Sequence, residues 1–217
     1  MVAARRRFLA TGAYDPLTST VRAAARYHAD GGAGETILDV GCGEGRHTRA
    51  LPFPLVLGVD VSKPAVAVAA RAHREGWYAV ANAAALPLAE GVADAAVNVF
   101  GPVFADELGR VVRRGGILVT AHPGPDHLAQ LRELVYDDPR PHELKPPLRH
   151  AEGCFEEISS EPLRWEMHLG EPAALLDLFA MTPYRWHGPP DIASRLATTP
   201  DAAVVTADVR VTCYRRR

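Results

Sequence analysis

Short aliphatic runs alternate with alanine-rich stretches along the first 120 residues of the chain. Four runs contain several valine, isoleucine or leucine residues and a fifth is Trp-Tyr-Ala-Val, and the intervals between most of them have helical composition. Strands that alternate with helices are typical of βαβ units in a parallel, doubly wound sheet. The predicted strands are 36–40, 55–60, 77–80, 95–99 and 117–120, and the predicted helices are 4–10, 17–29, 64–74 and 105–113.

The pattern changes after residue 121, where prolines become frequent. We predict a helix over 126–136, a strand over 155–169, a helix over 172–180 and a closing strand over 202–213. The chain is therefore predicted to form a mostly parallel sheet of seven strands with an insertion after the fifth. Insertions at the carboxyl ends of strands are where α/β proteins usually place substrate selectivity.

A glycine-rich loop follows the first predicted strand. Gly41, Gly43 and Gly45 have the spacing G-x-G-x-G, and Asp39 lies two residues before the first of them. Glycines there permit tight turning and close approach of the backbone to a ligand, and a helix is expected just after the loop. The spacing G-x-G-x-x-G would indicate NAD, whereas this spacing after an acid is usual for S-adenosylmethionine (SAM).

Two later segments fit a SAM site in the same order along the chain. Asp60 ends the second strand and is followed by Val61, so its carboxylate could accept hydrogen bonds from both ribose hydroxyls. Asn82 and the backbone amide of Ala83 follow the third strand, where the exocyclic amine and a ring nitrogen of adenine could be bound. An ordinary loop before a buried leucine and proline is the alternative for Asn82 and Ala83.

The end of the fourth predicted strand is the expected place of the methyl acceptor. Asn98 ends this strand region, and Phe100 and Pro102 follow it. An activated methyl donor requires alignment with the acceptor more than covalent help from the protein. We therefore predict that Asn98 lies at the cofactor and that Phe100 and Pro102 lie at the substrate.

Composition narrows the class of protein. The chain has 217 residues, of which 47% are hydrophobic and 23% charged, which is typical of a soluble globular domain and excludes a disordered, collagen-like or disulfide-stapled chain. Three cysteines without a C-x-x-C pair argue against a cysteine zinc site, so no metal is predicted. No apolar stretch is long enough to span a bilayer and no leader is evident, so a cytoplasmic location is expected.

Charge argues against a general affinity for nucleic acid. The chain carries 24 basic and 26 acidic residues, a net charge of −2, so the excess of basic residues that would favour nucleic-acid binding is missing. Nearly all basic residues are arginine, with triplets at 5–7 and 215–217. These arginines reflect either a composition bias with solvated termini or a local edge that faces phosphates.

Beyond these general motifs, the chain resembles the large-subunit (23S) ribosomal RNA guanine-N1 methyltransferases, a family that includes macrolide (tylosin) self-resistance enzymes. The resemblance runs almost from end to end, and its most particular segments are Pro-Gly-Pro-Asp-His-Leu at 123–128 and Met-Thr-Pro-Tyr-Arg-Trp at 181–186. The other matching segments are 4–9, 12–17, 38–45, 58–63 and 107–112. It implies a class I SAM-dependent methyltransferase fold.

The resemblance also implies roles for particular residues. The family's SAM contacts fall on Tyr14, Gly43, Glu44 and His127. Tyr14 could close over the cofactor, and its alternative role is a packing tyrosine. His127 could bind the polar end of SAM or accept a proton, or it could make only a structural hydrogen bond.

Further expectations concern the methyl acceptor. His122, where the family usually has threonine, is a second candidate base. Met181, Tyr184 and Trp186 would wall the acceptor pocket, with Tyr184 or Trp186 stacked on a flipped base, although all three could be core residues.

The domain is predicted to comprise a helical arm over the cofactor (1–30), a SAM-binding core (31–121), a substrate-side insertion with the sheet edge (122–200), and a last strand with a basic tail (201–217). The family begins with a cysteine and histidine zinc module that helps to bind RNA, and this chain is expected to lack it. The sequence neither requires nor excludes a homodimer.

Three functions remain open, of which two are enzymatic and one is not. The first is methylation of guanine N1 in ribosomal RNA, which the family segments favour. The second is methylation of a small heteroaromatic or other secondary metabolite, which the net charge and the expected lack of a zinc module favour. The third is a non-catalytic SAM-binding module.

Overall fold

The computed structural model describes residues 1–29, 35–143, 148, 153–186, 188–198 and 203–217. The chain forms two compact units. We call Met1–Pro16, Pro123–Leu144 and Pro162–Val209 the first unit, and Leu17–His122, Lys145–Glu161 and Arg210–Arg217 the second unit.

A seven-stranded sheet has the order β3-β2-β1-β4-β5-β7-β6. Its parallel part lies in the second unit, where β1 pairs with β2 and β4, β2 with β3, and β4 with β5. Five strands therefore run in one direction, and their carboxyl ends meet at one edge. These strands are β1 (Thr36–Val40), β2 (Leu55–Asp60), β3 (Trp77–Val80), β4 (Ala93–Val99) and β5 (Val112–Pro123).

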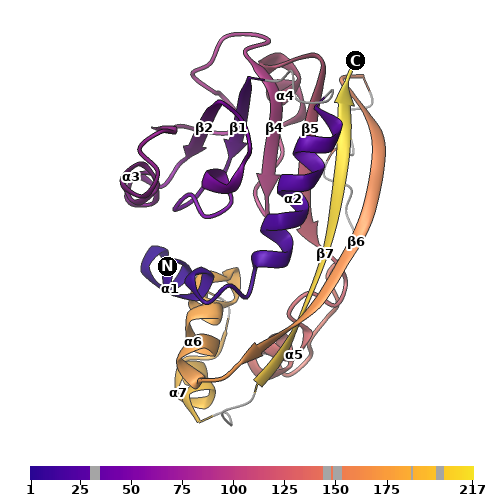
Figure 1. Cartoon of the computed structure of the whole chain (residues 1–217). Coiled ribbons are helices and arrows are strands. Elements are labelled where there is room, and N and C mark those ends of the chain that lie inside the picture. Colours follow the sequence, from indigo (N-terminus) through magenta and orange to yellow (C-terminus); the bar gives the residue numbers. More distant parts are fainter. Residues whose placement is uncertain (30–34, 144–147, 149–152, 187, 199–202) are drawn as a thin grey trace. The chain divides into compact units, whose positions relative to one another are not determined.

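The two remaining strands, β6 (Phe155–Leu169) and β7 (Ala203–Arg216), are long and contribute to both units. β7 runs against the direction of β5, so the sheet is mixed. Together these observations confirm the predicted α/β fold class with a mostly parallel seven-stranded sheet (Figure 1).

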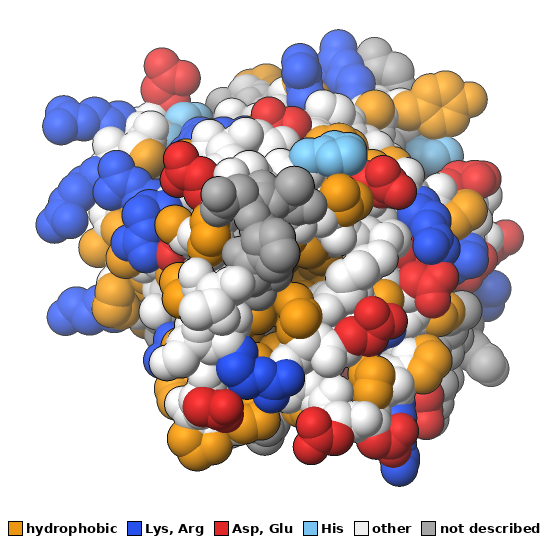
Figure 2. Space-filling model, turned by 90° about the horizontal axis from the view of Figure 1, so that it is seen from below, with side chains coloured by type: hydrophobic (Ala, Val, Ile, Leu, Met, Phe, Trp, Pro, Cys, Tyr) orange, Lys and Arg blue, Asp and Glu red, His pale blue; other side chains and the backbone are white. Residues whose placement is uncertain are grey.

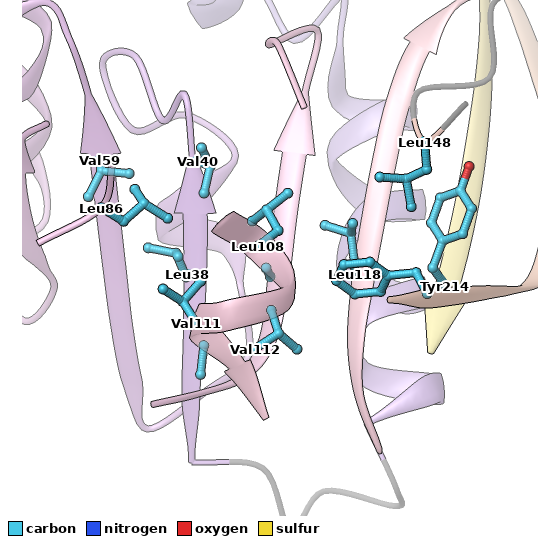
Figure 3. Close-up of a cluster of buried hydrophobic side chains, with 13 residues drawn as sticks. Leu38, Val40, Val59, Leu86, Leu108, Val111, Val112, Leu118, Leu148 and Tyr214 are labelled. Atoms are coloured by element: carbon cyan, nitrogen blue, oxygen red, sulfur yellow. The ribbon is translucent and has the colours of Figure 1, made fainter. Parts of the chain in front are cut away.

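The core of the second unit lies on the sheet. Every residue of β1 is buried, as expected for a central parallel strand that is covered on both faces. Figure 3 shows Leu38 of β1 and Leu118 of β5 in one apolar cluster with Leu108 of α4 (Ala105–Val111). Burial of this cluster holds the strand ends in place through the hydrophobic effect.

The other helices of the second unit follow from their residue patterns. α2 (Asp15–His28) buries Leu17, Val21 and Ala25 at helical spacing; it starts in the first unit and lies across the sheet over β4 and β5 in Figure 1. α3 (Lys63–Ala72) begins after Ser62, whose hydroxyl accepts from the Ala65 amide.

The prediction of a helix just after the glycine loop is wrong. Only a 3₁₀ turn, η2 (Thr48–Ala50), follows the loop. Pro52 and Pro54 come directly afterwards. Proline cannot donate a backbone hydrogen bond, and it disfavours helical backbone in the residue before it, so the helix cannot continue.

The first unit is largely helical. It contains α1 (Val2–Ala10), α5 (Ala129–Val135), α6 (Pro172–Met181), η3 (Pro183–Trp186) and α7 (Ile192–Ala197). The α1 residue Arg7 donates to Asp177 of α6 at 2.8 Å. The pattern predicted neither η3 nor α7, because both are short and lie among prolines. Within the described residues, no helix is long and apolar enough to cross a membrane.

Candidate functional site

The glycine loop has a backbone that only glycine adopts without strain. Gly41, Gly43 and Gly45 have φ angles of +84°, +56° and +81°, in the left-handed region that side chains with a Cβ avoid. A Cβ on Gly45 would also lie 3.0 Å from the Cβ of Ala69. The three predicted glycines therefore form a narrow backbone turn at the carboxyl end of β1.

The loop is attached to the end of β2. The backbone amides of Gly41 and Cys42 both donate to the Val59 carbonyl, at 2.8 and 3.0 Å. The Gly43 amide donates to Asp60 Oδ2 at 2.9 Å, and the Ser62 amide donates to Asp60 Oδ1 at 2.7 Å. A carboxylate has about four acceptor positions, so Asp60 can orient the loop and still accept hydrogen bonds from two ribose hydroxyls.

Acidic side chains shape the inside of the loop. Asp39 is buried and its Oδ2 accepts from the Thr48 hydroxyl at 2.5 Å, which ties β1 to the turn η2. Glu44 is also buried. Burial, together with the charge of Asp39 and of Asp60, raises the pKa of the Cys42 thiol, so Cys42 stays a thiol and is not a nucleophile.

The predicted adenine segment forms a tight turn after β3. The Ala84 amide donates to the side-chain oxygen of Asn82 at 2.9 Å, and the Ala85 amide donates to the Asn82 carbonyl at 3.0 Å. Asn82 is exposed, whereas Ala83 packs partly against the apolar cluster. Because the side-chain oxygen of Asn82 is bound within the turn, the turn fixes the direction of its side-chain amide nitrogen. Val61, after β2, is highly exposed.

Asn98 positions the segment that follows β4. Its side chain is 1% exposed, and Nδ2 donates to the Val40 carbonyl at 2.9 Å and to the Pro102 carbonyl at 3.2 Å. Between Asn98 and Pro102 in the sequence, Phe100 has a φ angle of +58°, which is a strained backbone for a residue with a bulky side chain. Asn98 therefore connects β1 to the predicted acceptor segment.

His122 lies beside that segment. β4 and β5 pair in parallel with Val99 opposite Ala121, and the Phe100 amide donates to the Ala121 carbonyl at 2.8 Å. The Nδ1 atom of His122 is buried and makes no hydrogen bond to any residue that the structure describes. Burial and then the positive charge of Arg210 lower the pKa of His122, so the imidazole is neutral at physiological pH.

In the first unit, Tyr14 and His127 lie together. Both are buried, and Tyr14 Oη lies 3.4 Å from His127 Nε2. The Asp208 amide donates to His127 Nδ1 at 3.3 Å. Nδ1 is therefore the acceptor nitrogen, and the proton of the neutral ring is assigned to Nε2, which faces Tyr14. The Trp165 ring packs edge-on against Tyr14, and its Nε1 donates to the Ala13 carbonyl.

A buried arginine holds the loop that carries His127. Arg132 is 6% exposed and donates to the His127 carbonyl at 2.6 Å and to the Pro125 carbonyl at 2.9 Å. Leu128 has a φ angle of +56°, which is why the predicted helix 126–136 begins only at Ala129. Within the described chain, Arg132 pairs with no carboxylate.

Neutral rings surround this arginine. The His142 ring stacks on Tyr184, with His142 Nε2 3.0 Å from Tyr184 Oη, and Tyr136 packs edge-on against Tyr184. Burial and then the charge of Arg132 lower the pKa of His142, and burial raises that of Tyr184. Sequence reasoning found Tyr184 but missed Arg132, His142 and Asp208, because no local pattern distinguishes them from surface residues.

The other predicted substrate residues are distributed differently. Met181 is half-buried at the end of α6. Trp186 is 67% exposed, and the Arg185 guanidinium lies 4.4 Å from its ring centroid. Tyr184 and Trp186 therefore have different surroundings, although they are two residues apart. Of the predicted site residues, Tyr14, His127, Met181, Tyr184 and Trp186 lie in the first unit and all others in the second.

The state of His127 predicts how stability depends on pH. Burial, and after it unfavourable electrostatic interaction with His142 and Arg132, lowers the pKa of His127 to about 3, whereas an unfolded histidine titrates at about 6.5. Between these values the unfolded chain binds more protons, so stability is lost as the pH falls. We expect His127 to contribute a loss of roughly 2 kcal/mol between pH 7.5 and pH 5.

Urea unfolding at both pH values measures this loss. The matched variant is His127→Asn, whose side-chain oxygen can still accept from the Asp208 amide. The loss on acidification should be smaller in the variant by about 2 kcal/mol. His142 titrates in both proteins, so its contribution cancels in the difference between their losses of stability. An equal loss in both would show that His127 is not held neutral.

Known proteins are similar to this chain either over its middle part or over almost its whole length. Residues 38–120 match the protein family described as a methyltransferase domain. A 23S rRNA (guanine(748)-N(1))-methyltransferase of Streptomyces fradiae is 40% identical over 222 residues, which cover 99% of this chain and 79% of that protein. A putative 23S rRNA (guanine-N(1)-)-methyltransferase of Micromonospora griseorubida is 35% identical over 99% of this chain and 79% of its own length.

Solved structures share the fold. A putative type II methyltransferase from Anaeromyxobacter dehalogenans has a TM-score of 0.60 at 23% identity and covers 89% of this chain and 95% of its own. A geranyl diphosphate methyltransferase solved in complex with SAM has a TM-score of 0.53 at 19% identity and covers 90% and 85%. Because both sequence identities are below 25%, these similarities show a shared fold and nothing about function.

Proposed function

The chain belongs to the family of 23S rRNA guanine-N1 methyltransferases and is a SAM-dependent methyltransferase, and on this premise we propose that it methylates N1 of a guanine in 23S rRNA. The observation that carries the proposal is the similarity to the Streptomyces fradiae enzyme along almost the whole chain. It extends over both units, well beyond the methyltransferase domain at 38–120. The site of action would be the cytoplasm, where ribosomes are found.

The residues of the second unit fit SAM. Bound SAM supplies a methyl group that its sulfonium charge already activates. The turn of Gly41, Gly43 and Gly45 lacks the side chains that would obstruct a ligand, and Asp60 retains acceptor positions for the ribose. We propose that these residues of the second unit hold SAM together with Asp39, Glu44, Val61, Asn82, Ala83 and Asn98. In the first unit, we propose Tyr14 and His127 as the positions that match the family's SAM contacts.

Guanine N1 carries a proton at neutral pH, and this proton must leave when a methyl group is added. His127 is a poor acceptor, because its pKa is about 3 and its Nδ1 already accepts from the Asp208 amide. His122 is the better candidate, since its Nδ1 has no hydrogen-bond partner among the described residues and its ring is neutral. We assign proton acceptance to His122 and a positioning role to His127.

The guanine itself would contact apolar and aromatic side chains. Phe100 and Pro102 follow the strand whose end Asn98 fixes, and a flipped base is usually bound by stacking and by hydrogen bonds to its edge. We propose that Phe100 and Pro102 contact the base. Met181, Tyr184 and Trp186 of the first unit stay predicted acceptor residues.

Primer extension tests the proposed function. The protein is incubated with SAM and 23S rRNA transcribed without modification, and the RNA is then reverse-transcribed. A methyl group on N1 blocks base pairing, so we expect a stop at one guanine that requires both protein and SAM. In the same assay, His122→Asn should slow the appearance of the stop without weakening SAM binding.

The control is the same reaction with S-adenosylhomocysteine, which carries no transferable methyl group. Labelled SAM and a mixture of free heteroaromatic compounds form a parallel reaction. Label in the small compounds, with none in the RNA, would reject the rRNA substrate and favour a metabolite methyltransferase.

A further inference from the structure

α2 presents a basic face opposite its buried face. Leu17, Val21 and Ala25 are buried, whereas Arg22 and Arg26 are exposed on the other side of the helix, one turn apart. The two guanidinium groups can therefore act on the same ligand.

These arginines line a groove in the second unit. Ser19, Arg22, Ala23 and Arg26 of α2 form one wall and Pro52 forms the other, around a space of about 500 Å³. A serine hydroxyl and two guanidinium groups are all hydrogen-bond donors, and Ala23 and Pro52 supply apolar surface. The two guanidinium groups donate and cannot accept, so they suit an anion. None of these residues belongs to the glycine loop or to the segment after β4.

The charges of the groove have no carboxylate partner among the described residues. Arg7, Arg110, Arg113 and Arg164 each form an ion pair with a carboxylate. Within the part of the chain that the structure describes, Arg22 and Arg26 have no such partner. Unpaired arginines held one helical turn apart can bind phosphate oxygens without first breaking an ion pair.

Two neighbouring features extend this surface. Tyr27, next to Arg26, is 81% exposed, and exposed aromatic rings can stack on unpaired RNA bases. At the end of α2, the charge of Arg215 lowers the pKa of His28, after the larger effect of burial. Arg215 of β7 therefore lies near the end of α2.

The overall charge makes such a local group necessary for RNA. The chain has a net charge of −2, and on the face drawn in Figure 2 basic side chains are interspersed with acidic and hydrophobic ones. Phosphate contacts supply much of the affinity of proteins for nucleic acid. A chain without a general basic excess must make these contacts with particular unpaired arginines.

We propose that the groove between α2 and Pro52 binds phosphate groups of the RNA substrate through Arg22 and Arg26, with Tyr27 beside them as a stacking surface. This proposal rests on the proposed function and adds to it an RNA contact outside the methyl-transfer residues. The groove would orient the RNA backbone and carry no sequence information.

RNA binding at several salt concentrations tests the groove. Binding of unmodified 23S rRNA transcript is measured for the wild type and for Arg22→Ala/Arg26→Ala. Each phosphate contact contributes a slope of about −0.7 to −0.9 to the plot of log affinity against log salt. Loss of two contacts should make the plot less steep by about 1.4 to 1.8, while SAM affinity is unchanged.

The matched control is Arg71→Ala/Arg74→Ala, which removes the same charge from two exposed arginines, one in the last turn of α3 and one just after it. A smaller slope in the groove variant alone supports the proposal. An equal change in both variants, or no change in the groove variant, overturns it. Because binding is measured without methyl transfer, a wild type that binds RNA but does not methylate it would reject the proposed function and leave the groove result standing.

Discussion

Asp60→Ala is expected to abolish measurable SAM binding. The substitution removes the acceptor of the Gly43 amide, which orients the glycine loop, and the acceptor proposed for the ribose hydroxyls. A hydrogen bond to a charged group contributes about 1.5–3 kcal/mol. Two lost bonds to the ribose therefore predict a rise of at least about 100-fold in Kd, measured by titration calorimetry with SAM.

Asp60→Asn separates the two roles of this side chain. The amide keeps the shape of the carboxylate and one of its two acceptor oxygens, so SAM affinity should lie between those of the wild type and the alanine variant. Thermal unfolding of all three proteins shows whether the fold is kept. A folded Asp60→Ala protein with unchanged SAM affinity would refute the proposed cofactor site.

Asn98→Asp is expected to destabilise the protein strongly at neutral pH. Asn98 Nδ2 donates to the carbonyls of Val40 and Pro102, and an ionised carboxylate has no proton to donate to either. Unsatisfied buried groups cost about 1–3 kcal/mol each, and more when they are charged. We expect a loss of at least about 3 kcal/mol, which lowers Tm by roughly 6–12 °C in a chain of this size.

The loss should depend on pH in a defined direction. Desolvation and the two carbonyl oxygens disfavour the charged form, so the pKa of the introduced acid would rise in the folded protein. The folded state then holds the proton more tightly than the unfolded state, and the difference from wild type should shrink as the pH falls from 7.5 to 5. Asn98→Ala, which places no charge there, is the control. Equal Tm values for wild type and Asn98→Asp at pH 7.5 would contradict the assigned bonds.

Most strands could be predicted because their signal is local. The bounds of β1, β2 and β3 agree with the predicted runs, since each is a short segment of aliphatic, β-branched or aromatic residues between turn residues. β5 extends from Val112 to Pro123, well beyond the predicted 117–120. Its additional residues include Arg113, Arg114 and two glycines, and their strand conformation depends on neighbouring strands more than on composition.

The residues of the candidate site also differ in whether the local sequence reveals them. The glycine loop and Asp60 were identified from spacing, because each lies at the end of a strand where a few residues define the turn. Arg132 was not identified, because its burial depends on tertiary packing, and Asp208 was not identified, because its role depends on contact with a distant residue. Asp208 bonds to His127, which lies 81 positions earlier, and no window of sequence contains both.

The sequence by itself determined that this chain forms a parallel α/β sheet, carries a glycine loop of the SAM type and resembles one family of rRNA methyltransferases. These properties depend on residues close together in the chain, or on segments that can be compared one at a time. Only the tertiary structure decided which nitrogen of His127 carries its proton, that Arg132 is buried, that Asn98 ties two strands together, and that Arg22 and Arg26 share a groove with Pro52. Burial and partner choice are properties of packing, because the same side chain is solvated or desolvated according to residues that the local sequence does not contain.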